Sequence, residues 1–317
     1  MVENEATPAV ECATPLPVAG LAESKPEGRG VRLLEEAAVA QGVRKIVRKV
    51  RGLARRDRGH APPPPFQPNT IELFYWKSPL GVNFGDYLSS VIVNKMAADA
   101  GCFLDEERPR PVRLLGIGSI LHFARNGDVV WGSGINGKIR DERHVFSSLD
   151  VRAVRGPLTR DFLMRRGIDV PEVFGDPGIL VADLLGCRFP KPAERKTPVA
   201  FVPNFHDLPK MEGWENVVSP LDYWASVVRR ISEASHVISS SLHGLVIADA
   251  FGIPCTYLRL SEEENTLKYE DYVLGVGRAR LDITRSREEA VRASPMGTAR
   301  PDLARLKASF PYDLWDC

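Results

Sequence analysis

The sequence has little cysteine and no run long enough to span a membrane. Five cysteines occur in 317 residues, scattered without a CxxC pair: Cys12, Cys102, Cys187, Cys255 and Cys317. An odd, widely spaced set argues against a disulfide framework and against a zinc site, so we expect buried thiols and no metal. No uncharged apolar stretch approaches the roughly 18 residues that a transmembrane helix needs, which excludes a membrane-spanning chain.

An excess of charge of one sign is also lacking. The 42 basic and 41 acidic residues leave a net charge of +1. This balance provides no global field for steering nucleic acid, so we expect no nucleic-acid partner. The first residues, Met1–Glu5, are acidic where a secretory signal is basic, and no apolar core of a signal peptide follows. We therefore expect a cytoplasmic location.

What the sequence does contain is enough apolar material for a large core. Hydrophobic residues make up 44% of the chain, and its length exceeds the usual size of a single core, so two domains are expected. We predict an N-terminal extension over residues 1–69, a first domain over 70–195 and a second domain over 196–317. A cleft between the two domains is the expected place for a ligand.

The predicted extension contains one basic amphipathic segment. Over residues 42–58, apolar residues recur at helical spacing and lysine or arginine fills the other faces, and a proline run at 62–65 follows as an extended spacer. Such a helix can lie on anionic lipid, at the cytoplasmic face of the inner membrane, or it can pack on its own domain. Both interpretations stay open at this point.

From residue 71 onward, strand patterns alternate with helix patterns. Strands are expected at 71–76, 112–117, 129–131, 151–154, 172–174, 198–202, 236–239 and 255–258, and helices at 87–98, 158–166, 223–234 and 242–251. This alternation is typical of parallel βα units, so we predict the α/β class with two facing Rossmann-like domains. The last 30 residues are expected to form one or two helices that pack back on the body.

The strongest candidate turn follows the strand at 236–239. Three serines, Ser239 to Ser241, lead from this strand into a helix, and His243 falls in the first helical turn. Ligands of open parallel sheets bind at such turns, where free N–H groups of the helix face an anion. The pattern also fits a capped core helix with a structural histidine.

Two arginines mark a second candidate turn at the end of the strand over 151–154. Arg152 lies in this strand and Arg155 directly follows it, and a guanidinium at a strand end suits bidentate binding of a phosphate or carboxylate. Surface ion pairs with Asp150 or Asp161 are the alternative.

Three further residues stand near turns. Asp86 opens the helix at 87–98, where it is either a favourable first-turn acid or a residue of the cleft. His122 and His206 each lie close to a turn, a position at which a lone histidine is more often a surface residue than a catalyst.

Collinear blocks along the chain show a family resemblance. The blocks are 85–86, 118–123, 131–138, 149–157, 175–178, 238–245, 268–272 and 310–315. With these blocks the chain resembles the polysaccharide pyruvyl transferase family, and within it the ketal pyruvate transferases of exopolysaccharide assembly. The resemblance covers about 74–315 and leaves residues 1–69 without a counterpart.

The resemblance implies a fold and a reaction. It implies two Rossmann-like domains arranged as in GT-B glycosyltransferases, phosphoenolpyruvate as co-substrate with no other cofactor, and a lipid-linked oligosaccharide whose terminal hexose accepts the pyruvate. It places catalysis on His243, a cleft role on Asp86 and donor binding on Arg155. Many members carry an arginine two positions before this histidine, where this chain has Ser241.

That departure changes the expected donor site. Anchoring of the donor must then use the hydroxyls of Ser240 and Ser241 with the N–H groups of the helix, or another cation, for which Arg152 and Lys268 are candidates. His243 would protonate the methylene carbon of phosphoenolpyruvate, and Asp86 or His122 would act as base. Two other classes share these features: a GT-B glycosyltransferase using a sugar nucleotide, and a non-catalytic glycan-binding assembly protein.

Overall fold

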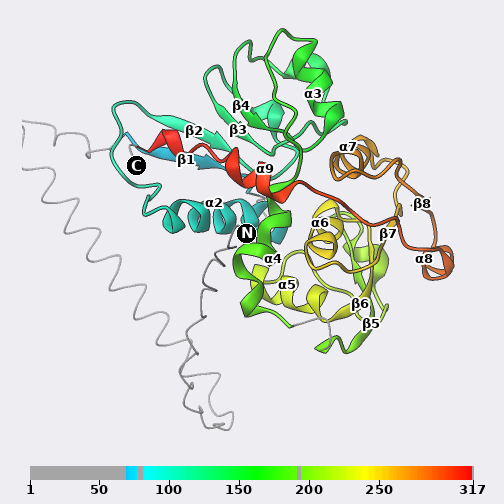
Figure 1. Ribbon diagram of the computed structural model, residues 1–317. Coiled ribbons are helices and arrows are strands. Elements are labelled where there is room, and N and C mark those ends of the chain that lie inside the picture. Colours follow the sequence, from blue (N-terminus) through cyan, green and yellow to red (C-terminus); the bar gives the residue numbers. More distant parts are fainter. Residues whose placement is uncertain (1–68, 78–80, 191–193, 316–317) are drawn as a thin grey trace, which may run out of the picture. The chain divides into compact units, whose positions relative to one another are not determined.

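Two parallel β-sheets form the framework of the computed structural model (Figure 1), which describes residues 69–77, 81–190 and 194–315. The predicted amphipathic helix at 42–58 and the proline run at 62–65 lie outside the described residues. Each sheet has four strands, and every strand pair is parallel. The predicted α/β class is therefore confirmed.

The first sheet has its strands in the order in which they occur along the chain. They are β1 (Ile71–Phe74), β2 (Val112–Leu115), β3 (Val129–Trp131) and β4 (Asp150–Ala153). The strand expected at 172–174 is reduced to a single bridge between Val154 and Phe174. A turn at 175–178 follows this bridge at once and leaves no room for a longer strand.

The second sheet also keeps sequence order. Its strands are β5 (Thr197–Val202), β6 (Ala234–Ser239), β7 (Cys255–Leu258) and β8 (Ile283–Thr284). The strand β6 ends in a continuous buried run, from Val237 to Ser239, as is typical of parallel strands covered on both faces. The pairing of β5 with β6 is the longest in the molecule's described part and runs from Thr197 to Val202.

Eight α-helices occur in the described residues. They are α2 (Phe84–Asp99), α3 (Pro157–Met164), α4 (Val181–Leu185), α5 (Trp224–Ser232), α6 (Leu242–Ala250), α7 (Leu267–Gly275), α8 (Arg287–Arg292) and α9 (Leu303–Ala308). The start of α2 is fixed by Asn83, whose side-chain oxygen accepts a hydrogen bond from the Gly85 N–H at 2.9 Å. This cap satisfies an otherwise unpaired donor at the helix start.

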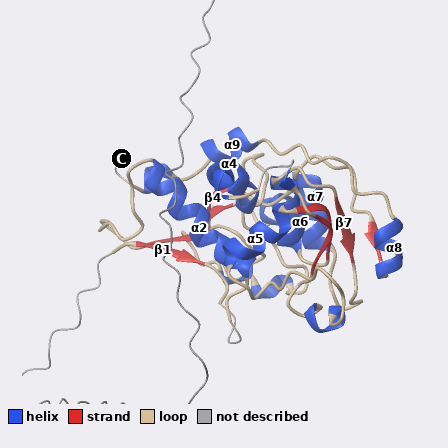
Figure 2. Ribbon diagram, turned by 90° about the horizontal axis from the view of Figure 1, so that it is seen from below, coloured by secondary structure: helices blue, strands red, loops and turns tan. Residues whose placement is uncertain are grey.

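Helix α6 is the central helix of the fold. Its residues from Leu242 to Ala248 are buried on every side, which agrees with a sequence that is apolar all round. It packs on α5, on the strands β6 and β7, and on the 3-10 turn η3 (Pro177–Leu180). Figure 2 shows α2, α5 and α6 side by side, so the starts of α2 and α6 can contribute to one site.

One apolar core runs through both sheets. Leu114 and Trp131 of the first sheet belong to the same buried cluster as Val237 and Leu245 of the second half. Residues 68–317 accordingly form one compact unit, and the predicted boundary between residues 195 and 196 falls in the sequence between the two sheets.

The C-terminal segment returns to the first sheet. The indole N–H of Trp131 donates to the Leu306 carbonyl at 3.0 Å, and the indole N–H of Trp315 donates to the Phe103 carbonyl at 2.7 Å. The red segment in Figure 1 follows this return. The expectation that the last residues pack back on the body is confirmed, although they contact residues assigned to the first domain.

Cys255 is a free, buried thiol, as expected, whereas Cys102 and Cys187 are disulfide-bonded, so the expectation of thiols throughout is wrong. Of the helices that the structure describes, none combines the length and the apolar character needed to cross a bilayer.

Candidate active site

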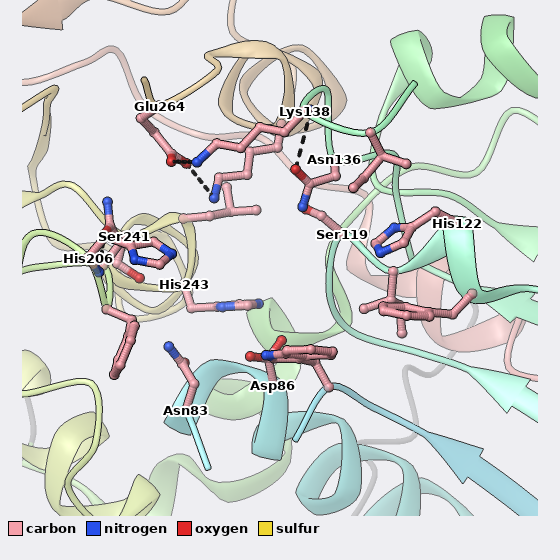
Figure 3. A pocket seen from close by; sticks show the side chains of 18 of the residues that line it. Asn83, Asp86, Ser119, His122, Asn136, Lys138, His206, Ser241, His243 and Glu264 are labelled. Atoms are coloured by element: carbon pink, nitrogen blue, oxygen red, sulfur yellow. Dashed lines mark hydrogen bonds and ion pairs between the residues drawn. The ribbon is translucent and has the colours of Figure 1, made fainter. Parts of the chain in front are cut away.

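A cavity of about 410 Å³ lies where loops of both halves meet the starts of α2 and α6. Its size falls within the range usual for small-molecule sites. Its polar lining comprises Asn83, Asp86, Ser119, His122, Asn136, Lys138, Asn204, His206, Ser241, His243, Glu264 and Lys268. Figure 3 labels all of these except Asn204 and Lys268. The structure therefore brings together His243, Asp86, His122, Ser241 and Lys268 from the predicted set.

His243 lies in the first turn of α6, at the centre of this cavity (Figure 3). Its Nε2 is 3.6 Å from an oxygen of Asp176, whose side chain is fully buried. The other oxygen of Asp176 accepts from the Gly178 N–H at 2.9 Å, which fixes the carboxylate. The imidazole thus has a carboxylate behind it, at a distance longer than a hydrogen bond, as is common in ligand-free sites.

The histidine ring also needs a glycine beside it. A Cβ atom added to Gly85 would lie 2.0 Å from Nδ1 of His243, a clash that only glycine avoids. This close approach explains why position 85, in the first turn of α2, is a glycine. The two helix starts are packed so tightly that the ring of His243 lies next to Asp86.

Asp86 is a carboxylic acid in the lining of the cavity, next to His243. Burial raises its pKa to about 6, against the opposing effect of His243 and Lys268, while the carboxylate of Asp176 adds to the rise. A carboxyl group with a pKa near neutrality can exchange a proton with a substrate. The interpretation of Asp86 as a residue of the cleft is therefore the one that the geometry supports.

A carboxylate held between two lysines forms another wall. Glu264 forms an ion pair with Lys268 at 2.6 Å and a second one with Lys138. Although burial alone would raise it, the two lysines hold the pKa of Glu264 below its ordinary value. Burial lowers the pKa of Lys268, and Glu264 counteracts this effect. The cavity thus carries two cations that share one anion.

His122 occupies the side of the cavity opposite His206 and Ser241 (Figure 3). Its pKa is lowered by burial and by the neighbouring His144 and Arg143. Its buried Nδ1 has no hydrogen-bond partner among the described residues. The lowered pKa favours the neutral imidazole, the form that a base requires.

Arg155 lies behind the cavity wall instead of on it. Its side chain is fully buried and forms an ion pair with Asp271 at 3.0 Å, and the guanidinium also donates to Ser119 Oγ at 2.6 Å and to the Ile135 carbonyl at 2.7 Å. Because these N–H groups are bonded within the protein, the side chain of Arg155 is not placed to bind the donor substrate. The structure instead makes it a support for Ser119, which does line the cavity.

Arg152 and Ser240 are also not on the cavity wall. The guanidinium of Arg152 pairs with Asp150 at 2.5 Å and with Asp313 at 2.7 Å, so the alternative of ion pairing applies. Ser240 is buried, and its hydroxyl accepts from the Asn204 N–H at 3.1 Å. Neither residue is placed to anchor a donor, because both are engaged in holding loops together.

The serines before α6 do not cap it. Ser239 donates its hydroxyl to the Val202 carbonyl at 2.8 Å, and the side chain of Ser241 makes no capping hydrogen bond. Ser241 lines the cavity at the N-terminus of α6. The helix start is thus available to an anion, as the serine turn indicated.

Asp176, Lys138 and Glu264 belong to the site or support it, but the sequence alone did not single them out as site residues. Asp176 was visible as part of the strand-to-helix turn at 175–178, but nothing in the sequence connects it with His243. Lys138 follows a glycine-rich turn, and Glu264 follows the strand β7, so the position after a strand was the available signal. In the ranges 69–77, 81–190 and 194–315, no three His, Cys, Asp or Glu side chains gather as a metal site.

The sequence matches the model of a known family. Residues 73–262 match the family model described as "Polysaccharide pyruvyl transferase", which covers more than half of the chain. The chain belongs to the polysaccharide pyruvyl transferase family.

Two individual proteins are similar to part of the chain. Over 218 residues the chain is 28% identical to the succinoglycan biosynthesis protein ExoV of Rhizobium meliloti (strain 1021), a match that covers 64% of each protein. The chain thus spans less than two thirds of the length of ExoV. Over 216 residues it is 26% identical to the uncharacterized protein L143 of Acanthamoeba polyphaga mimivirus, covering 62% of this chain and 72% of L143.

One solved structure is also similar. It is the crystal structure of the functionally uncharacterized protein KP1_0663 from Klebsiella pneumoniae subsp. pneumoniae NTUH-K2044, with a TM-score of 0.41 and 14% identity. The match covers 69% of this chain and 93% of that protein.

Proposed function

We propose that this protein transfers a pyruvyl group from phosphoenolpyruvate to a glycan of exopolysaccharide biosynthesis, where the pyruvate forms a ketal. The observation that carries the proposal is the position of His243 at the start of α6, 3.6 Å from Asp176 and in one cavity with Lys138 and Lys268. Membership of the pyruvyl transferase family supports the same reaction.

The donor carries a carboxylate and a phosphate, and the cavity offers cations for both. Lys138 and Lys268 face it from the two halves of the fold, and the N-terminus of α6 beside Ser241 adds free N–H groups. Positive charge at these positions stabilises an anion. In the proposed complex, one or both lysines leave Glu264 and form ion pairs with the donor substrate. Lys138 and Lys268 then form the anion site that was expected at Arg155 and Arg152.

The reaction needs an acid and a base. A protonated His243 transfers its proton to the methylene carbon of phosphoenolpyruvate, which makes the adjacent carbon electrophilic. One hydroxyl of the acceptor adds to that carbon, and a second hydroxyl of the same sugar displaces phosphate and closes the ketal. Asp86 or His122 accepts the protons that the two hydroxyls lose.

The finer features of the proposal concern the fold and the acceptor. The two parallel sheets are taken as the facing Rossmann-like halves of a GT-B-like architecture, in support of which each contains four parallel strands. The acceptor is the terminal hexose of a lipid-linked oligosaccharide. The basic segment at 42–58 would hold the enzyme at the membrane that carries this lipid.

Product analysis tests this function against its alternatives. Purified protein is incubated with phosphoenolpyruvate or with sugar nucleotides, each in the presence of candidate glycolipids. Phosphate release together with a pyruvylated glycan supports the proposal. Release of nucleotide identifies a glycosyltransferase, and glycan binding without consumption of either donor identifies an assembly protein.

A further inference from the structure

An exposed tryptophan stands at the edge of the cavity. Trp76 follows β1, lines the cavity and is 43% exposed. Its ring is stacked on that of Phe123, with centroids 5.6 Å apart and an angle of 17° between the planes. Tryptophan is enriched at binding surfaces, because one side chain contributes a large apolar contact area and a polar N–H group.

Phe123, the ring on which this tryptophan stacks, is held in place by packing and by a hydrogen bond. Phe123 packs on Phe74, with ring centroids 5.4 Å apart, and its carbonyl accepts from Arg113 at 2.8 Å. The guanidinium of Arg113 lies 4.1 Å from the centroid of Phe74 and is paired with the buried Asp128 at 2.7 Å. The stack is therefore supported from below by a buried cation, and Trp76 forms its outer layer.

The chemistry of this wall differs from that of the lysine wall. Trp76 and Phe123 line the cavity together with Ile120 and Ile139, whereas the cations Lys138 and Lys268 are shared with Glu264. A small dianion has no favourable contact with a stacked aromatic pair. A pyranose ring does, because one of its faces presents C–H groups while its hydroxyls point outward at the rim.

We infer that Trp76, stacked on Phe123, is the platform on which the accepting sugar ring packs with its C–H face. The inference rests on the proposed function in assigning this ring to the acceptor. The ring of His122 lies 4.0 Å from that of Phe123, so hydroxyls of a sugar on the platform would reach the imidazole. The platform thus places the acceptor next to His122, while His243 and the lysines hold the donor.

Binding of simple glycosides without a donor tests the platform. The probes are the methyl β-pyranosides of glucose, galactose and mannose, followed by saturation-transfer NMR on their ring C–H protons. Wild-type protein is expected to bind at least one of them. Trp76→Ala should weaken that binding about threefold to tenfold, because an aromatic contact of this kind is worth about that factor. Trp76→Phe should restore most of it.

Phe103→Ala is the matched control, since Phe103 is 56% exposed and does not line the cavity. It should bind the glycosides as wild-type protein does. The platform is overturned if wild-type protein binds none of the three probes, or if Trp76→Ala and Phe103→Ala bind them equally well.

A parallel assay separates the platform from the proposed reaction. Phosphate release from phosphoenolpyruvate reports the reaction, whereas glycoside binding reports the platform. Trp76-dependent binding without phosphate release keeps the platform and rejects pyruvyl transfer. Phosphate release with Trp76-independent binding rejects the platform and keeps pyruvyl transfer.

Discussion

Arg155 and Asp271 form an ion pair at 3.0 Å in which neither side chain is exposed. The pair joins the turn after β4 to α7, the helix that carries Lys268. Thr159 donates its hydroxyl to the same carboxylate at 2.6 Å, and a Cβ atom on Gly156 would lie 1.8 Å from the Asp271 carbonyl. The place of Lys268 in the cavity therefore depends on a contact that is out of reach of the substrate.

Removing this buried arginine should cost stability before it changes the chemistry. Breaking a buried ion pair by removing one partner costs about 3–5 kcal/mol, so Arg155→Ala should lower the free energy of unfolding by about that amount. Urea denaturation measures it, with Arg280→Ala as control because Arg280 forms an exposed pair with Asp282. An Arg155→Ala protein that is as stable as wild type but no longer binds phosphoenolpyruvate would contradict the supporting role. It would restore the hypothesis that Arg155 binds the donor substrate.

Asp86 should set the acidic limb of the pH profile. As a base it acts in its deprotonated form, and its pKa is raised to about 6 by burial. The rate should therefore fall as the pH drops through about 6. Asp86→Asn should lower kcat by about 10²- to 10⁴-fold and remove that limb. Steady-state rates between pH 5 and 8 test this, with His122→Asn in parallel, and a limb that disappears with His122 instead would contradict the assignment.

Much of the fold was predictable because its strands have clear boundaries. The strands at 129–131 and 255–258 were placed without error, since Gly127 and Gly132 flank the first run and Pro254 immediately precedes the second. Helix α7 was missed because its buried face includes Asp271, Tyr269 and Tyr272, residue types that do not mark an apolar stripe. The short strand β8 has two residues, too few for a periodic signal.

Lys268 should bind the donor more than it supports the fold. A charge-assisted hydrogen bond contributes about 1.5–3 kcal/mol, so Lys268→Ala should raise the Kd for phosphoenolpyruvate by about tenfold or more. Lys307→Ala is the matched control, because Lys307 also forms an ion pair, with Asp183 at 2.8 Å, but lies outside the cavity. Calorimetry on both variants measures the effect, and equal donor affinities would remove Lys268 from the site.

The sequence indicated the site residues that stand at helix starts. It did not show which charged side chains pair with one another in the folded chain. His243 and Asp86 were selected because each opens a helix after a strand or loop, and the structure places both in the cavity. Arg155 was assigned to the donor substrate from its place at a strand end and from the family resemblance. Its partner, Asp271, stands 116 positions further along the chain, so the sequence did not reveal the pair. Only the folded chain shows which of two arginine roles, ligand binding or buried support, applies.

The N-terminal extension should affect location and not chemistry. Deleting residues 1–68 should leave turnover of a short water-soluble acceptor unchanged, because the cavity lining described in the structure lies at and beyond Trp76. The same deletion should abolish sedimentation with vesicles that contain anionic lipid, since the basic segment at 42–58 is lost. Equal sedimentation of the full-length and truncated proteins would contradict the membrane role.

In the proposed reaction, His243 protonates the methylene carbon of phosphoenolpyruvate while a glycan is converted to its pyruvate ketal. The most direct measurement is the reaction in D₂O with phosphoenolpyruvate and a glycolipid acceptor, followed by NMR of the product. We expect a ketal methyl group that carries one deuterium, formed with one phosphate per ketal, and a rate lower by about 10²- to 10⁴-fold in His243→Ala. Near-normal ketal formation by His243→Ala, or a ketal methyl group without deuterium, would contradict this role of His243.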